Sequence, residues 1–177
     1  MKSSISSPAP PSADKIFLAL GQTLYVCQLF EATMLEVLAV AHELLDGTGD
    51  GRKYQASLET LSRKTLGQLL HDLRKSADIK SEVDSQLDAG LEARNFVVHR
   101  FAEHLGEDLI DESKAIAHQR TLYEKCALVM TANDTGLALL HAIGHMNSTK
   151  SSKLIAEFEE TVRALRDMPT QYSEPRH

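Results

Sequence analysis

Apolar positions recur every three or four residues along most of this 177-residue chain, which is the spacing of amphipathic helices. The first such pattern runs from Ala13 to Leu45 and carries two neighbouring apolar stripes. The main stripe consists of Phe17, Leu20, Leu24, Cys27, Met34, Leu38, Ala41 and Leu45, and the second of Val26, Phe30, Val37, Val40 and Leu44. A helix that is apolar around so much of its circumference packs on more than one side. We therefore expect a central helix or a subunit interface.

Four further helices follow from the same periodicity. Thr65 is a suitable N-cap for a helix from Leu66 to about Lys75. The later patterns cover about Ser81 to Leu105, Glu112 to His145 and Ser152 to Asp167, and the apolar stripe of the first of these three is Val83, Leu87, Leu91, Val98 and Phe101. Strand-like alternation and internal repeats do not stand out. The sequence thus predicts an all-α, up-and-down helical bundle of about five helices.

The remaining segments indicate the domain limits. Residues 1–12 are rich in Ser and Pro and predict a disordered N-terminal segment, which leaves 13–167 as a single helical-bundle domain and 168–177 as a frayed tail. The glycine-rich run at 46–51 predicts a loop that extends to about residue 54. Its alternating acidic residues lack the other ligands and the late Glu of an EF-hand, so we do not expect calcium binding.

The composition is that of an ordinary soluble protein, with 42% hydrophobic and 25% charged residues. A net charge of −6 argues against a broad basic surface for duplex DNA, although a small basic pocket remains compatible with it. Cys27 and Cys126 have no metal-ligand spacing and predict buried free thiols in a reducing, cytoplasmic compartment. Neither a run of membrane-spanning length nor a signal-peptide core stands out, so we expect no membrane association.

The hexapeptide Arg94-Asn95-Phe96-Val97-Val98-His99 carries the main candidate chemistry. A histidine can move a proton near neutral pH, and an arginine presents a fork of donors that suits phosphate oxygens. Asn95 and His99 lie one helical turn apart and are therefore neighbours on the helix surface. The pattern with Asn directly after Arg arises by chance in about one such chain in a hundred. The hexapeptide predicts metal-free phosphodiester chemistry.

Two interpretations of Arg94 remain open from the residues alone. Arg94 falls on the apolar stripe between Leu91 and Val98, where an unpaired charge is costly. Glu31 interrupts the main stripe of the first helix and is the best candidate for an internal ion pair. Alternatively, Arg94 faces a groove where it meets phosphate, and Glu31 orients the guanidinium instead of neutralising it.

One histidine performs only half of an RNA-cleaving reaction. Attack by a 2′-hydroxyl needs a base for that hydroxyl, and the reaction gains from an acid for the leaving oxygen. If the helices over 81–105 of two copies meet across a twofold axis, both functions come from one sequence. We therefore expect a homodimer with a composite site built from Arg94, Asn95 and His99. Arg100 is the candidate contact to the RNA backbone.

The pattern Arg94-Asn95-x-x-x-His99, near the end of a helix in a small all-α bundle, resembles the motif of the HEPN superfamily. The segments TLGQLL at 65–70 and LEARNFVVHRF at 91–101 support the resemblance, which covers about residues 13–147. It implies a HEPN-like fold and a homodimeric, metal-independent endoribonuclease without a cofactor, in a toxin–antitoxin, phage-defence or RNA-processing setting. It also implies that Arg94 contacts the phosphate and transition state, that His99 is the general acid/base, and that Asn95 orients them.

The chain departs from the family pattern at one position. HEPN toxins that a nucleotidyltransferase silences tend to carry Tyr two positions after the motif His, where this chain has Phe101. An antitoxin of that kind is therefore disfavoured, and an inhibitor protein of another kind stays open as a partner. Some family members are non-catalytic, the mannitol-repressor-like proteins among them. The alternative function is accordingly a HEPN-like regulatory or protein-interaction module.

The other candidate residues form weaker patterns. His141 and His145 lie one turn apart but lack a third ligand in the sequence, so we predict no metal site. His104, His118 and Arg120 either widen a positive rim around the hexapeptide or lie on an ordinary surface. Nucleophile-elbow and phosphate-cradling glycine motifs are absent from the sequence.

Overall fold

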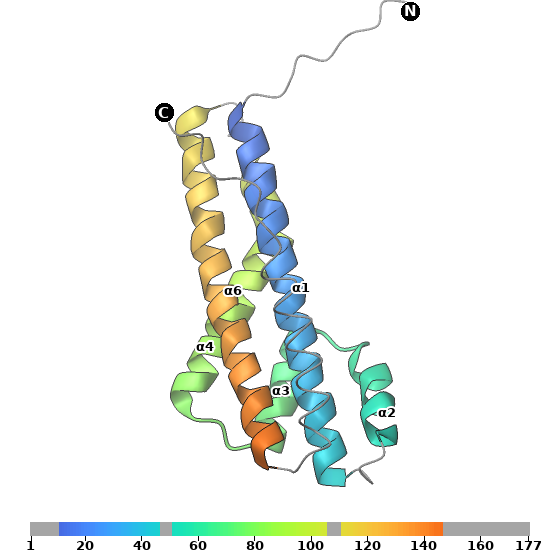
Figure 1. The fold of residues 1–177 in the computed structure, drawn as a ribbon. Helices are drawn as coiled ribbons and strands as arrows, with labels where there is room; N and C mark the ends of the chain where they lie inside the picture. The colour runs from blue at the N-terminus through green and yellow to red at the C-terminus, as the bar shows by residue number, and fades with distance from the viewer. Residues whose placement is uncertain (1–10, 47–50, 106–110, 147–177) are drawn as a thin grey trace, which may run out of the picture.

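The computed structural model describes residues 11–46, 51–105 and 111–146. These residues form five helical rods. Four of them are single helices: α1 (Pro11–Asp46), α2 (Arg52–Leu61), α3 (Leu66–Ser76) and α6 (Glu112–Met146). The remaining rod, between α3 and α6, is continuous and consists of α4 (Ser81–Asn95), the π-helical turn η1 (Phe96–Arg100) and α5 (Phe101–Leu105). The described ranges contain no strand, and the predicted all-α bundle is confirmed (Figure 1). The helix predicted over 152–167 and the tail over 168–177 lie outside the described residues.

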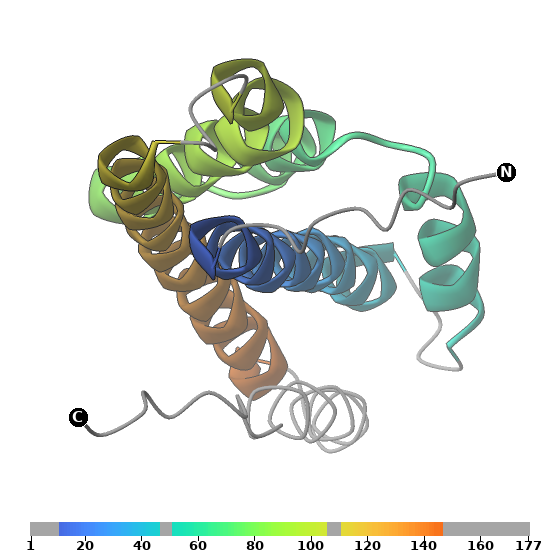
Figure 2. The ribbon, with the colours of Figure 1, turned by 90° about the horizontal axis from the view of Figure 1, so that it is seen from above.

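The two long helices α1 and α6 form the axis of the molecule. They begin at the same end and run side by side in the same direction, while the α4–η1–α5 rod runs antiparallel to them (Figure 1). The direction of the three long rods thus alternates along the chain, as in an up-and-down bundle. α2 lies on the side of α1 away from α6 (Figure 2).

Small and polar residues allow these three rods to approach closely. The buried hydroxyl of Thr33 on α1 donates to Oδ1 of Asn133 on α6 at 2.7 Å. A Cβ atom added to Gly136 would lie 2.8 Å from Cγ2 of Thr33, and one added to Gly90 of α4 would lie 2.2 Å from the Cβ of Ala132. Large apolar side chains fill the remaining core, with Ile16, Phe30, Met34, Leu38, Leu87, Phe101 and Leu122 among those fully buried.

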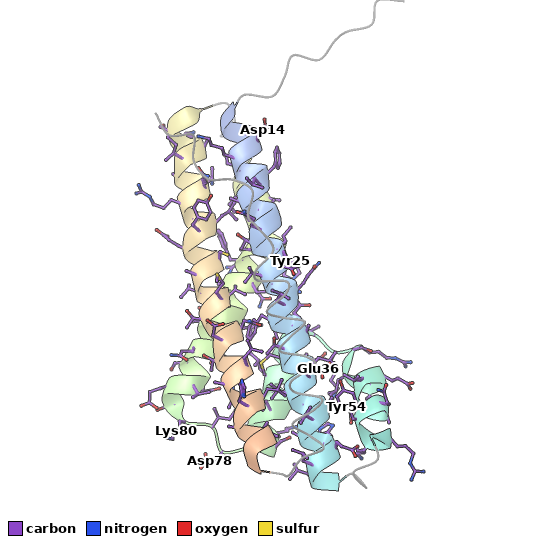
Figure 3. The ribbon with its side chains drawn as sticks, in the orientation of Figure 1. Asp14, Tyr25, Glu36, Tyr54, Asp78 and Lys80 are labelled. Atoms are coloured by element: carbon purple, nitrogen blue, oxygen red, sulfur yellow. The ribbon has the colours of Figure 1, made fainter. Side chains whose placement is uncertain are left out.

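α2 is a helix that the sequence analysis did not predict, because part of its segment was assigned to a loop extending to residue 54. The loop instead ends at Gly51, which has a positive φ of 80°. The Glu43 carboxylate accepts hydrogen bonds from the amide N–H groups of Gly51 (3.1 Å) and Tyr54 (2.9 Å). A side chain of α1 thus provides acceptors for backbone N–H groups at the start of α2 that have no partner within the helix. The Tyr54 hydroxyl also donates to Glu36 at 2.7 Å (Figure 3). Burial raises the pKa of both Glu36 and Tyr54.

α3 begins as predicted, at a capping box. Oγ1 of Thr65 accepts the amide N–H of Gln68 at 3.3 Å, and the Gln68 side chain accepts the amide N–H of Thr65 at 2.8 Å. Arg74, in the last turn of α3, forms salt bridges with Asp84 and Asp88 of α4. These ion pairs connect α3 to the first half of the helix that carries the hexapeptide.

Several residues assigned to the core lie on the surface. Phe17 and Leu45 are 53% and 69% exposed, and they lie towards the two ends of α1. Val98 is 40% exposed, and its neighbour Val97 is buried in its place. Both thiols are free, but Cys126 is only partly buried. Burial raises the pKa of both thiols, that of Cys27 to about 11.

Two helices have the length and composition of a membrane span, so the expectation that no run reaches this length is wrong. The segments 13–45 and 113–144 reach a mean hydropathy of 1.5 and 1.3, with 44% and 28% of the respective windows buried in the protein. A core helix of a soluble protein meets the same criterion, and the hydrogen bond between Thr33 and Asn133 shows that the two helices pack against each other. A cytoplasmic location stays a prediction.

Candidate functional site

The hexapeptide lies where α4 gives way to the π-helical turn η1. The amide N–H of Phe101 donates to the carbonyl oxygen of Phe96, five residues back, instead of four. In a regular α-helix, positions five apart point about 140° away from each other. In a π turn, where the hydrogen bond joins residues five apart, the angle between such positions is much smaller. The wide turn therefore brings Arg94 and His99 to the same side of the rod.

Arg94 is the centre of a hydrogen-bonded cluster. Its Nη1 donates to Oδ1 of Asn95 at 3.1 Å and to Nε2 of His99 at 3.0 Å. Its Nε donates to Oε1 of Glu31 on α1 at 2.6 Å. A guanidinium has donors but no acceptor, so the bond between Arg94 and His99 requires an unprotonated Nε2. The ring proton of His99 therefore lies on Nδ1. The structure thus brings together the three predicted catalytic residues, with Glu31 as a fourth member.

The ion pair between Arg94 and Glu31 is present, and one amino group of the guanidinium has no hydrogen-bond partner within the described ranges. The side chains of Arg94 and Glu31 are 20% and 37% exposed, and His99 is exposed. Nη2 of Arg94 makes no hydrogen bond to any residue that the structure describes. Glu31 therefore fixes the guanidinium through Nε and leaves one amino group for an anion beside His99. The two interpretations of Arg94 are compatible in this geometry.

Two cations lie over the ring of Phe96, the residue that follows Asn95. Cζ of Arg100 is 5.7 Å and Nζ of Lys125 is 5.3 Å from the ring centroid, within the range of cation–π attraction. Arg100 was predicted as an RNA contact and lies next to His99 in the chain. Lys125 was not predicted, because it reaches this place from α6 and only helix packing brings it here.

The other predicted candidates lie apart from the hydrogen bonds of Arg94. The ring of His118 packs edge-on against Phe101, with 6.0 Å between the ring centroids, and Arg120 is exposed. His141 is exposed, while the side chains of His104 and His145 lie outside the described residues. In the part of the chain that the structure describes, no three His, Cys, Asp or Glu side chains are grouped as metal ligands.

A cavity of about 250 Å³ lies elsewhere, between α1, α2 and the connection to α3. Its lining residues are His42, Lys53, Ala56, Ser57, Thr60, Leu61 and Lys64. His42 Nδ1 lies 3.1 Å from the hydroxyl of the buried Ser57, a pair that the sequence analysis did not predict because Ser57 sits inside a helix and not on a nucleophile elbow. Lys64 pairs with Asp72 at 2.6 Å, which balances its charge. The contact between His42 and Ser57 joins α1 to α2.

No protein-family model, no curated protein and no solved structure matches this chain.

Proposed function

We propose that this chain is a HEPN-type, metal-independent endoribonuclease that cleaves RNA through attack of the 2′-hydroxyl. The observation that carries the proposal is the convergence of Asn95 and His99 on Nη1 of Arg94, next to solvent. This arrangement offers an unprotonated imidazole nitrogen beside a permanently charged guanidinium with a free amino group. Those are the two groups that a phosphodiester cleavage without metal requires.

In the proposed reaction, Nε2 of His99 exchanges its hydrogen bond with Arg94 for the 2′-hydroxyl of the substrate and removes the proton. O2′ attacks phosphorus, the P–O5′ bond breaks, and the products are a 2′,3′-cyclic phosphate and a 5′-hydroxyl. The guanidinium of Arg94 stabilises the charge that develops on the phosphorane oxygens. Asn95 and Glu31 hold the guanidinium in place by its other donors.

The proton for the leaving O5′ comes from a second subunit in this proposal. Among the described residues, Arg94 holds a single imidazole, that of His99. The adjacent Val98 is 40% exposed and offers an apolar contact for a partner. An isologous contact through η1 places the same residues of the second copy opposite the first. His99 of the other copy, in its protonated imidazolium form, then donates the proton to the leaving O5′, while His99 of the first copy keeps the proton taken from the 2′-hydroxyl.

The direct test is cleavage of a labelled RNA oligomer in excess EDTA. We expect the rate to be the same with and without the chelator, and the 3′ ends of the products to carry cyclic phosphate, because no step uses a metal. Product ends are identified by mass spectrometry. Loss of activity in EDTA, or 3′-hydroxyl products, would contradict the proposal.

The alternative, a non-catalytic regulatory or protein-interaction module, is favoured by the surface of α6. Ile116, Tyr123 and Met130 are spaced by seven residues and are 54%, 50% and 40% exposed, which is the spacing of a helix-pairing seam. Tyr123 points about 160° away from Lys125 around the helix axis, since the two are two residues apart. Lys125 faces Phe96. Pairing through this seam would therefore hold the two copies of His99 apart.

Disulfide cross-linking separates the two modes of pairing. We expect Val98→Cys to form a covalent dimer under mild oxidation, and Tyr123→Cys to remain largely monomeric on non-reducing gels, because the composite site requires η1 at the twofold axis. Both variants are made in a Cys126→Ser background, since Cys126 is only partly buried. Efficient cross-linking of Tyr123→Cys alone would favour the non-catalytic module.

A further inference from the structure

The ring of Phe96, in the π-helical turn that also carries His99, contacts two positive charges from different helices. Arg100 follows His99 in η1, and Lys125 comes from α6, with their charged groups 5.7 and 5.3 Å from the ring centroid. The attraction between a cation and the face of an aromatic ring limits the positions that each long side chain adopts. Each charge is thus held within about 6 Å of the same ring.

Neither cation is neutralised by a carboxylate among the residues that the structure describes. The salt bridges found there involve Lys64, Arg74 and Arg94 as the basic partners. The acidic residues closest in sequence, Glu103 and Glu124, are exposed and form no salt bridge with Arg100 or Lys125 in the described ranges. In a chain with a net charge of −6, this makes a local positive site.

We infer that Arg100 and Lys125 form a second phosphate-binding pair, which takes a further backbone phosphate of the single-stranded RNA whose scissile phosphate Arg94 holds. The inference rests on the proposed function, because it assigns a further phosphate of the same substrate. It adds a residue of α6 to a site whose other members lie on the α4–η1 rod and on α1. Both side chains present donors to phosphate oxygens while the ring of Phe96 supports their cationic groups.

Binding of a 2′-O-methyl RNA oligomer tests the inference with the intact chain, because this oligomer lacks the attacking hydroxyl. Each phosphate contact to a single strand contributes about 0.7 to the slope of log K against log salt. We expect Lys125→Gln and Arg100→Gln each to weaken binding about fivefold at 0.1 M salt and to reduce the slope by about 0.7. Fluorescence anisotropy over a salt series measures both quantities.

The matched control is Lys80→Gln, the same charge change at the far end of α4 from η1 (Figure 3). It should change the affinity less than twofold and leave the slope unaltered. Equal effects of Lys80→Gln and Lys125→Gln would overturn the inference, and so would tighter binding of a polyglutamate peptide than of the oligomer, which would assign the surface to an acidic protein.

The two proposals fail in different ways. If RNA is cleaved but Lys125→Gln binds and cleaves as the unaltered chain does, the phosphate-binding pair is wrong and the nuclease proposal stands. If the oligomer binds with the expected dependence on Lys125 but RNA is never cleaved, the pair stands as an RNA contact and the nuclease proposal is wrong.

Discussion

Replacing His99 with alanine is expected to lower the rate of RNA cleavage by about 10²- to 10⁴-fold, the usual contribution of a general acid or base. The imidazole is exposed and lies on the surface of η1, so its removal takes away a hydrogen bond to Arg94 and little packing. The melting temperature should therefore change little. Initial rates with a fluorogenic RNA oligomer in EDTA, together with a thermal unfolding curve, measure both effects.

His71→Ala is the matched control for this substitution. His71 is also an exposed histidine on a helix, but it lies on α3 and makes no hydrogen bond among the described residues. The His71→Ala variant should cleave RNA at the rate of the unaltered chain. If His99→Ala and His71→Ala both retain full activity, the cleavage comes from another group or from a contaminant, and His99 has no catalytic role.

The residues of the candidate site could mostly be predicted from the sequence, but their contacts in space could not. Arg94 and Glu31 both interrupt apolar stripes, and this shared anomaly was enough to name Glu31 as the best candidate partner of Arg94; the structure contains that ion pair. The contact between Arg94 and His99 was not predictable from spacing, because five residues in a regular α-helix separate the two side chains by about 140°. The π turn that removes this separation depends on how the whole rod packs, and so does the approach of Lys125.

The same contrast holds for the fold. The ends of the long helices agree with the predicted ones to within two residues, because periodicity and caps such as Thr65 are local signals. α2 escaped prediction because its stabilising groups, Glu36 and Glu43, belong to α1. Assigning Val98 to the core was wrong because the stripe was continued with regular α-helical spacing across residues that form a π turn.

Gly90→Ala is expected to be the most damaging single-methyl addition to the described core. The new Cβ would lie 2.2 Å from the Cβ of Ala132 and 3.1 Å from Cε1 of Phe30. The Cβ of Ala132 is fixed to its backbone and cannot rotate away, so α4 and α6 must separate by more than 1 Å. We expect a loss of about 1–3 kcal/mol in the free energy of unfolding, measured by urea denaturation.

Gly21→Ala makes the same chemical change with the opposite expected sign. Gly21 is exposed on α1 and a Cβ there would meet no atom within 4 Å, so the alanine should stabilise the helix by up to about 1 kcal/mol.

Gly90→Ala should also slow cleavage at temperatures where it stays folded, because Arg94 lies one turn further along α4 and moves with it. If Gly90→Ala is as stable and as active as Gly21→Ala, the close contact of α4 with α6 does not position the Arg94 cluster.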